Sequence, residues 1–169
     1  MVVHVFVLGV DPGLSRCGYA VLDARSRPAT AVAIGVLRTS PDDELPARLA
    51  ELHAEVKALL DEFAPSVVAV ERIFVQHNLR TAVSVGQASG LVLAEAAARG
   101  CTIAQYSPNE VKLAVTGDGA ADKAAVATMV TTLLGLARAP RPADAADAAA
   151  LALCHLAHAP LAAAIGAVR

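Results

Sequence analysis

Apolar positions along the chain fall into short runs and into longer segments with a helical period. Runs rich in Val, Ile, Thr and Tyr between turn residues predict β-strands, and apolar residues at three- and four-residue steps predict helices. We expect strands at about 3–11, 17–23, 30–39, 67–70 and 101–106. We expect helices at about 44–63, 79–98, 121–136 and 142–158, and a short one that starts at Ser107-Pro108. This order predicts an α/β fold with a mixed five-stranded sheet flanked by helices.

Length and composition favour a single domain over residues 1–169. Hydrophobic residues make up 56% of the chain and charged residues 18%, which excludes a disordered protein. Cys17, Cys101 and Cys154 lie far apart, and this predicts buried free thiols in a reducing cytoplasm. We interpret the apolar start as a strand, since a signal peptide would begin with basic residues. No apolar run approaches the ~20 residues of a membrane span.

Small residues predict where helices pack closely. Gly86 and Gly90 lie four apart in the expected helix at 79–98, where missing side chains would permit close contact. Alanine is densest from Ala143 to Ala164, which favours a helix that lies close to the sheet. The apolar tail from Leu161 to Val168 would pack either on the domain or on a partner, and the sequence leaves both open.

Two predicted strands end in a carboxylate. Asp11 ends the first strand, where Pro12-Gly13 forces a turn and Pro12 holds Asp11 in an extended conformation. Glu71 likewise follows four apolar residues. Each acid alone is typical of a turn or a solvated strand end. Ligands of open α/β sheets bind beyond the carboxyl ends of the strands, however, and both acids are expected at that edge.

A second pair of acids opens the last helix. Asp144 and Asp147 are three residues apart and therefore share one helix face. A general preference of acids for helix N-termini explains Asp144. It explains Asp147 less well, because Leu151 and Cys154 follow on the same face and should be core.

Four carboxylates at one sheet edge repel each other unless a cation neutralises them. Such oxygen ligands suit Mg²⁺ or Mn²⁺. Two such ions about 4 Å apart can activate water and stabilise the leaving oxygen in phosphodiester cleavage. We therefore expect a metal site with about two ions at Asp11, Glu71, Asp144 and Asp147. This chemistry needs no nucleophilic side chain.

Several motifs together resemble the RuvC family of Holliday-junction resolvases. They occur in the family's order and at its spacing, from about Val5 to Pro160. The motifs are VLGVDPG near the start, VAVERIF at 68–74, GQASG at 86–90, VK at 111–112, the segment from Gly119 to Lys123, and PADAADA at 142–148.

The resemblance implies a ribonuclease H-like fold and a Mg²⁺-dependent endodeoxyribonuclease. Its substrate would be a four-way DNA junction, which a homodimer nicks symmetrically during recombination and repair. The partner would be the branch-migration complex RuvA–RuvB. The catalytic set would be the four acids named above. Lys112 and Lys123 would contact DNA phosphate, Phe74 would stack on an unpaired base at the junction centre, and Arg80 would meet the backbone nearby.

Other families and the charge balance bear on this interpretation. A ribonuclease H-like nuclease of the YqgF type, acting on RNA or simple branches, shares the D-x-G start but not the Phe74 position or the Asp144/Asp147 pair. Sugar-kinase-like and Hsp70-like ATP binders also share D-x-G but need over twice this length.

The formal charge of −2 and the pI of about 6.2 are low for a nucleic-acid binder. Two divalent cations on the acids would reverse the sign of that charge.

Overall fold

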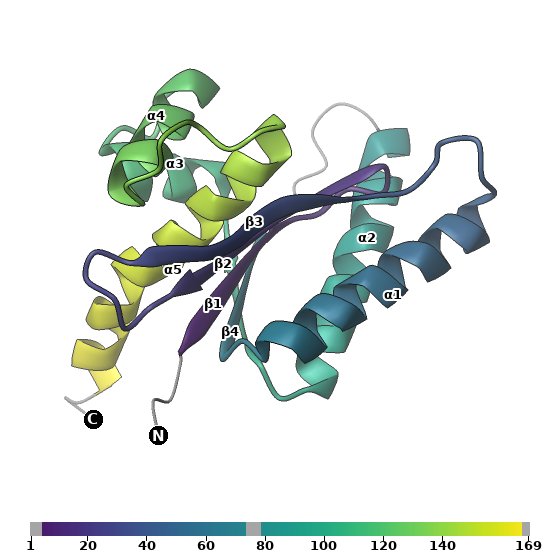
Figure 1. Ribbon diagram of the computed structural model, residues 1–169, viewed down its shortest axis with the longest axis horizontal. Coiled ribbons are helices and arrows are strands. Elements are labelled where there is room, and N and C mark those ends of the chain that lie inside the picture. The colour runs from purple at the N-terminus through teal and green to yellow at the C-terminus, as the bar shows by residue number, and fades with distance from the viewer. Residues whose placement is uncertain (1–4, 74–78, 167–169) are drawn as a thin grey trace.

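The chain forms a five-stranded mixed sheet (Figure 1). The computed structural model describes residues 5–73 and 79–166, with side chains at 5–73 and 82–159. The strand order is β3-β2-β1-β4-β5. The first three strands pair antiparallel, whereas β1, β4 and β5 run parallel. The strands are β1 (Phe6–Asp11), β2 (Arg16–Asp23), β3 (Thr30–Arg38), β4 (Val67–Glu71) and β5 (Thr102–Tyr106). The predicted mixed five-stranded sheet is confirmed.

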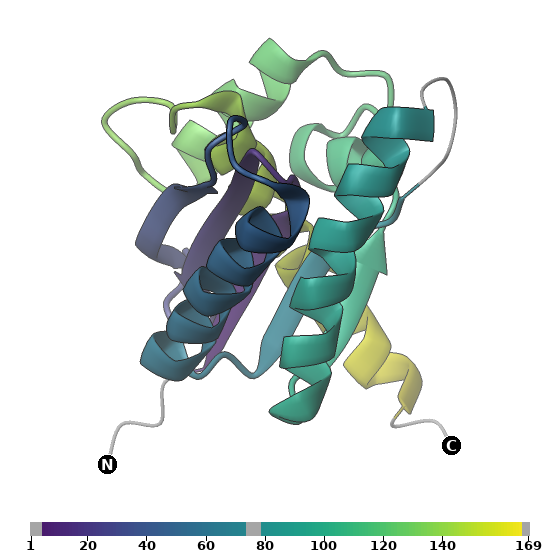
Figure 2. The same ribbon diagram turned by 90° about the vertical axis from the view of Figure 1, so that its right-hand side faces the viewer.

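Helices cover both faces of the sheet (Figures 1 and 2). One face carries α1 (Leu45–Phe63) and α2 (Leu79–Ala98). The other carries α3 (Pro108–Thr116), α4 (Lys123–Leu133) and α5 (Ala143–Gly166). The predicted helices are confirmed to within a few residues, except at the end of α5. That helix continues to Gly166, so the predicted end at 158 was wrong, and the apolar tail from Leu161 continues the helix.

Two side-chain caps fix the helices next to the carboxyl edge. Ser107 caps α3 in a capping box with Glu110, which confirms the helix start predicted at Ser107-Pro108. Asp122 caps α4, since its carboxylate accepts a hydrogen bond from the backbone N–H of Ala125 at 2.8 Å. The cap makes Lys123 the first residue of α4 and fixes its backbone.

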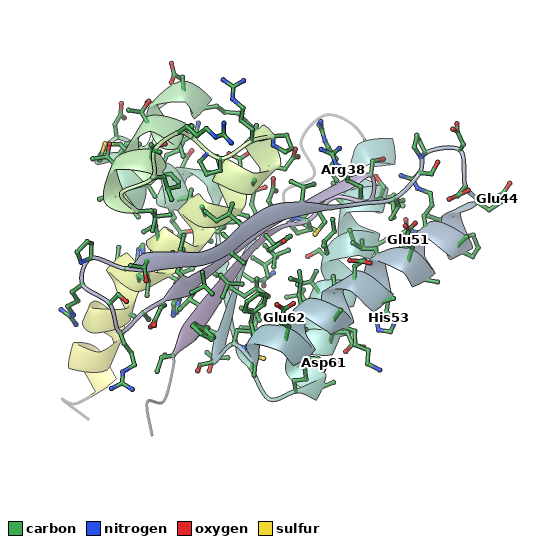
Figure 3. All side chains as sticks on the ribbon, in the orientation of Figure 1. Arg38, Glu44, Glu51, His53, Asp61 and Glu62 are labelled. Carbon is green, nitrogen blue, oxygen red and sulfur yellow. The ribbon has the colours of Figure 1, made fainter. Side chains whose placement is uncertain are left out.

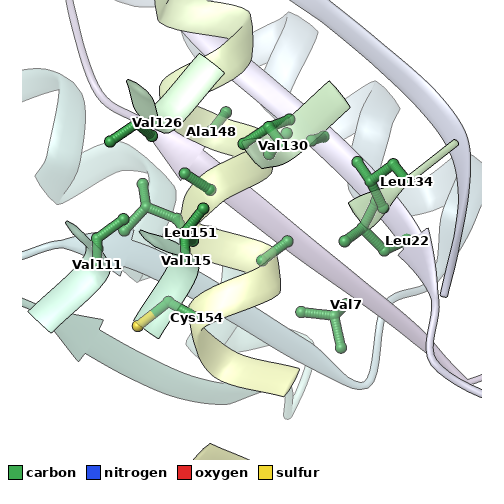
Figure 4. Close-up of a cluster of buried hydrophobic side chains, with 14 of the residues drawn as sticks. Val7, Leu22, Val111, Val115, Val126, Val130, Leu134, Ala148, Leu151 and Cys154 are labelled. Carbon is green, nitrogen blue, oxygen red and sulfur yellow. The ribbon is translucent and has the colours of Figure 1, made fainter. Parts of the chain in front are cut away.

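Helix α5 lies directly against the backbone of the sheet, as its alanines predicted (Figure 4). A Cβ atom on Gly9 of β1 would lie 2.1 Å from the carbonyl oxygen of Ala148. One on Gly18 of β2 would lie 2.0 Å from the carbonyl oxygen of Asp144. Glycine is therefore required at both positions, because any side chain would push the helix away.

The opposite face packs through larger side chains. Leu52, Val56 and Leu60 of α1 are buried against Val21 of β2 and Val68 of β4, among others. The close contact predicted at Gly86 and Gly90 was wrong. In the part of the chain that the structure describes, a Cβ atom at either glycine would meet no atom within 4 Å.

The cysteines and helix lengths bear on two further predictions. All three cysteines are free; Cys17 and Cys154 are buried as expected, but Cys101 is only partly so. In the part of the chain that the structure describes, no helix is both long and apolar enough to cross a membrane.

Candidate active site at the carboxyl edge of the sheet

Asp11 and Glu71 end the neighbouring parallel strands β1 and β4. Val10 is aligned with Val70 in the register of these strands, so the two acids leave the sheet at the same level. Both line a cleft of about 370 Å³. Asp147, Lys112 and Lys123 line the same cleft. The structure thus brings together three of the four predicted acids and both predicted lysines.

Asp147 comes from α5 and meets a lysine from α4. The Nζ atom of Lys123 lies 2.9 Å from Oδ2 of Asp147 and donates a hydrogen bond to it. This bond is the main cause of the raised pKa of Lys123. The lysine side chain is 78% exposed, so one side of the ammonium group faces solvent. Lys123 can therefore offset the charge of Asp147 and still meet a ligand in the cleft.

Asp144 is not among the residues that line this cleft. Its Oδ2 atom lies 3.3 Å from Nε of Arg16, the first residue of β2. It lines a second hollow with Ser15, Arg16 and Arg48. Asp144 nevertheless lies close enough to Asp11 to contribute to the raised pKa of that residue. The four acids therefore form one electrostatic group at the edge of two hollows.

The electrostatics of the cleft oppose full ionisation of its acids. Burial raises the pKa of Asp11 to about 7, and the charges of Asp147, Glu71 and Asp144 add to the shift. Burial and the charge of Asp147 also raise the pKa of Glu71. Lys123 lowers both pKa values but does not cancel the rise. At neutral pH the group therefore favours anything that brings positive charge to it.

The chemistry of the four acids fits a hard divalent cation. All four acids offer only oxygen atoms, which Mg²⁺ and Mn²⁺ prefer. Burial and neighbouring carboxylates raise the pKa values of Asp11 and Glu71, and a bound cation would favour their ionised forms. Among the described residues, however, no three His, Cys, Asp or Glu side chains are already arranged around one point that could hold an ion.

The side chains of two further residues predicted to bind DNA are not among those that the structure describes. Phe74 lies outside the described residues. Arg80 belongs to α2, but its side chain is not among those described. Their proposed contacts with DNA therefore stay predictions.

Sequence reasoning missed residues that build the site. Gly9 and Gly18 admit α5 to the sheet, and Arg16 holds Asp144. Glycines inside two strands next to an alanine-rich helix were a usable signal for the first pair. Nothing in the sequence pointed to Arg16, because its partner is 128 positions away.

The chain matches the profile of a family described as "Crossover junction endodeoxyribonuclease RuvC" over residues 7–155. The chain belongs to the RuvC family. This decides against the YqgF-type and kinase-like families. The RuvC protein of Saccharopolyspora erythraea is 55% identical over 157 residues, which cover 92% of this chain and 79% of that protein. The RuvC protein of Rhodococcus opacus (strain B4) is 54% identical over 156 residues, 92% of this chain and 82% of that one.

Solved structures agree with membership of the RuvC family. Thermus thermophilus RuvC in complex with a Holliday junction substrate has a TM-score of 0.88 at 39% identity, covering 94% of this chain and 97% of that one. The yeast mitochondrial Holliday junction resolvase has a TM-score of 0.67 at 17% identity, covering 89% of this chain and 78% of that one. The first match bears out the predicted ribonuclease H-like fold, and the second shows a shared fold alone.

Proposed function

We propose that this chain is an endodeoxyribonuclease that resolves Holliday junctions by symmetric nicking of DNA phosphodiesters during recombination and repair. One observation carries the proposal: carboxylates from β1, β4 and α5 meet two lysines in a single cleft. The curated relatives are named for this activity. The Thermus thermophilus neighbour is described in complex with a Holliday junction substrate.

Divalent metal ions, Mg²⁺ or Mn²⁺, complete the proposed site. Asp11, Glu71, Asp144 and Asp147 would hold two such ions per site. The four negative charges of the carboxylates would balance the four positive charges of two divalent cations. When bound, such ions supply activation of water and stabilisation of the leaving oxygen. Without them, the acids in the cleft would repel a DNA phosphate.

The chain's own lysines would position the DNA strand. Lys112 lines the cleft, and Lys123 faces it from the first turn of α4. Both therefore bring positive charge to the place where the scissile phosphate would lie.

The remaining contacts and partners belong to the same proposal. Phe74 would stack on a base at the junction centre, and Arg80 would contact the backbone. Two symmetric nicks need two active sites, which a two-fold homodimer provides on a substrate of matching symmetry. The dimer would act in the cytoplasm with the RuvA–RuvB branch-migration complex.

Nicking of a synthetic four-way junction tests the proposal. The full-length chain is mixed with an end-labelled junction or with linear duplex of the same sequence, in Mg²⁺, in Mn²⁺ and in excess chelator. We expect paired symmetric nicks in the junction, little cutting of the duplex and none in chelator. Equal cutting of both DNAs contradicts junction selectivity, preference for RNA or simple branches favours a YqgF-like activity, and cutting in chelator contradicts the metal site.

A further inference from the structure

Two exposed arginines face each other at the start of β2 and the end of β3. Arg16 and Arg38 are direct partners in this antiparallel pair, so their side chains leave the same face of the sheet. Figure 3 shows Arg38 where β3 leaves the sheet. Like charges directly opposite each other destabilise a sheet. Only Arg16 has an acid partner, Asp144, among the described residues.

A third arginine reaches the same corner from α1. Nη2 of Arg48 donates a hydrogen bond to Oγ of Ser15 at 2.6 Å, and its Nε donates to Oγ1 of Thr39 at 3.0 Å. Ser15 and Thr39 are the chain neighbours of Arg16 and Arg38. Thr39 is buried and donates to the carbonyl oxygen of Leu14 at 2.7 Å. Arg48 is thus fixed in place by neutral groups, which leave its charge uncompensated.

Arg16, Arg38 and Arg48, here called the arginine cluster, differ from an arginine that serves the fold. Arg99 pairs with both Asp61 and Glu95, which balance its charge. In the arginine cluster, by contrast, the only carboxylate within ion-pair distance in the described chain is Asp144. The cluster therefore holds an excess of positive charge in a protein whose formal charge is −2.

The arginine cluster adjoins the active site across Asp144. A hollow of about 260 Å³ is lined by Ser15, Arg16, Arg48 and Asp144, among others. Asp144 lies one turn before Asp147 in α5, and Asp147 lines the cleft with Asp11 and Glu71. Arg16 uses Nε for Asp144, while its side chain is 54% exposed and keeps further N–H donors for a second anion.

We propose that the arginine cluster is a second phosphate site, which binds the DNA backbone next to the phosphate that is cut. This inference rests on the proposed nuclease function. A strand that leaves the cleft past Asp144 would meet Arg16 and Arg48 in the hollow, with Arg38 opposite Arg16 in the sheet. Guanidinium groups form forked hydrogen bonds to phosphate oxygens, and this role accounts for like charges placed opposite each other in the sheet.

The test measures junction binding with Ca²⁺ in place of Mg²⁺, so that cleavage does not interfere. The variants are Arg16→Gln and Arg38→Gln, each beside a charge-keeping partner, Arg16→Lys and Arg38→Lys. The control is Arg27→Gln, which removes the same charge from the exposed loop at the opposite end of β2 and β3. Junctions with one neutral methylphosphonate, moved along the strand from the cleavage site, locate the contact.

Arg16→Gln and Arg38→Gln should each weaken binding roughly tenfold and reduce the salt dependence by about one phosphate contact. The Lys variants should retain most of the affinity. A methylphosphonate near the cleavage site should weaken wild-type binding but not that of the Gln variant, since the contact is already lost. Melting temperatures should stay close to that of the wild type.

Three outcomes would overturn the inference. One is a loss for Arg27→Gln equal to that for Arg16→Gln, which would show only a general charge effect. Another is slower cleavage by Arg16→Gln with unchanged binding at every methylphosphonate position, which would make Arg16 a positioning residue for Asp144. In both cases a wild-type chain that cuts junctions leaves the proposed function intact. A wild-type chain that neither binds nor cuts junctions removes the proposed function and the inference together.

Discussion

The pKa values of carboxylates on the two faces of the sheet are shifted in opposite directions. On the α1–α2 face, Glu95 accepts hydrogen bonds from His53 and Arg99, and these hold its pKa below the usual range. On the α5 face, burial and neighbouring carboxylates raise the pKa values of Asp11 and Glu71. Glu95 thus has its positive partners within the chain, whereas Asp11 and Glu71 need positive charge that the chain supplies only in part.

The two faces also differ in how closely their helices approach the sheet. Leucines and valines separate α1 from the sheet. On the other face, Ala145, Ala148 and Ala152 are at most 1% exposed, and Gly9 and Gly18 let the backbone of α5 approach closely. This approach carries Asp144 and Asp147 to the ends of the strands. Small residues therefore build the active site, although they carry no chemistry of their own.

The largest effect should follow loss of a carboxylate. We expect Asp11→Asn, Glu71→Gln, Asp144→Asn and Asp147→Asn each to slow junction nicking at least a hundredfold, about 3 kcal/mol at the transition state. Junction binding should persist or tighten, because repulsion of phosphate falls. Single-turnover nicking and binding of the same variants measure both quantities. Near-normal cleavage by two of these variants would contradict the assignment of the site.

The raised pKa of Asp11 predicts a pH dependence of stability without metal. Its pKa is 3.8 when unfolded and about 7 when folded, so unfolding releases a proton between these values. The free energy of unfolding should therefore fall as pH rises from about 4 to about 7, by at most about 4 kcal/mol. Denaturation in chelator should show this slope, and Asp11→Asn should flatten it. Glu55→Gln, on the exposed side of α1, is the matched control; a slope that stays unchanged in Asp11→Asn would contradict the pKa.

Substitution of a sheet glycine should damage stability and activity together. In Gly18→Ala the new Cβ would lie 2.0 Å from the carbonyl oxygen of Asp144. The helix must move, which should cost about 3 kcal/mol or more of unfolding free energy and displace Asp144. The control is Gly90→Ala in α2, where nothing lies within 4 Å; it should gain about 0.5–1 kcal/mol. Chemical denaturation compares the two, and equal stabilities would show that the α5 contact is not tight.

The sequence predicted the elements that rest on local rules and missed those that rest on distant contacts. Ser107-Pro108 marked a helix start through a local cap, and the alternation of strands and helices predicted the sheet. Asp11 and Glu71 could be placed together because the ends of parallel strands share an edge of the sheet. The ion pair of Arg16 with Asp144 joins β2 to α5, and no local pattern encodes such a pair. The close packing predicted at Gly86 and Gly90 was wrong for the same reason, because the spacing of glycines does not show which element faces a helix.

Substitutions at Phe74 should show whether its ring binds DNA or packs in the core. If the ring stacks on a junction base, Phe74→Ala should weaken the cutting-competent complex by about 1–3 kcal/mol and leave folding almost unchanged. Phe74→Tyr and Phe74→Trp should keep much of the activity, whereas Phe74→Leu should resemble Phe74→Ala. Thermal melting and junction nicking measure the four variants side by side. A loss of about 3–5 kcal/mol in stability would instead make Phe74 a core residue.

The smallest effect should come from the paired charges of the α1–α2 face. Glu95→Gln removes the acceptor of His53 and Arg99, so a small fall in melting temperature is expected at neutral pH. Because the folded pKa of Glu95 is lowered, its contribution is present above its unfolded pKa of 4.5 and lost as pH falls through the folded value. The difference from wild type should therefore shrink in acid, opposite in sign to the effect of Asp11. Junction nicking should not change, since Glu95 lies on the far face of the sheet. A marked loss of cleavage would mean that the two faces are coupled, and would contradict the claim that cleavage depends on the α5 face alone.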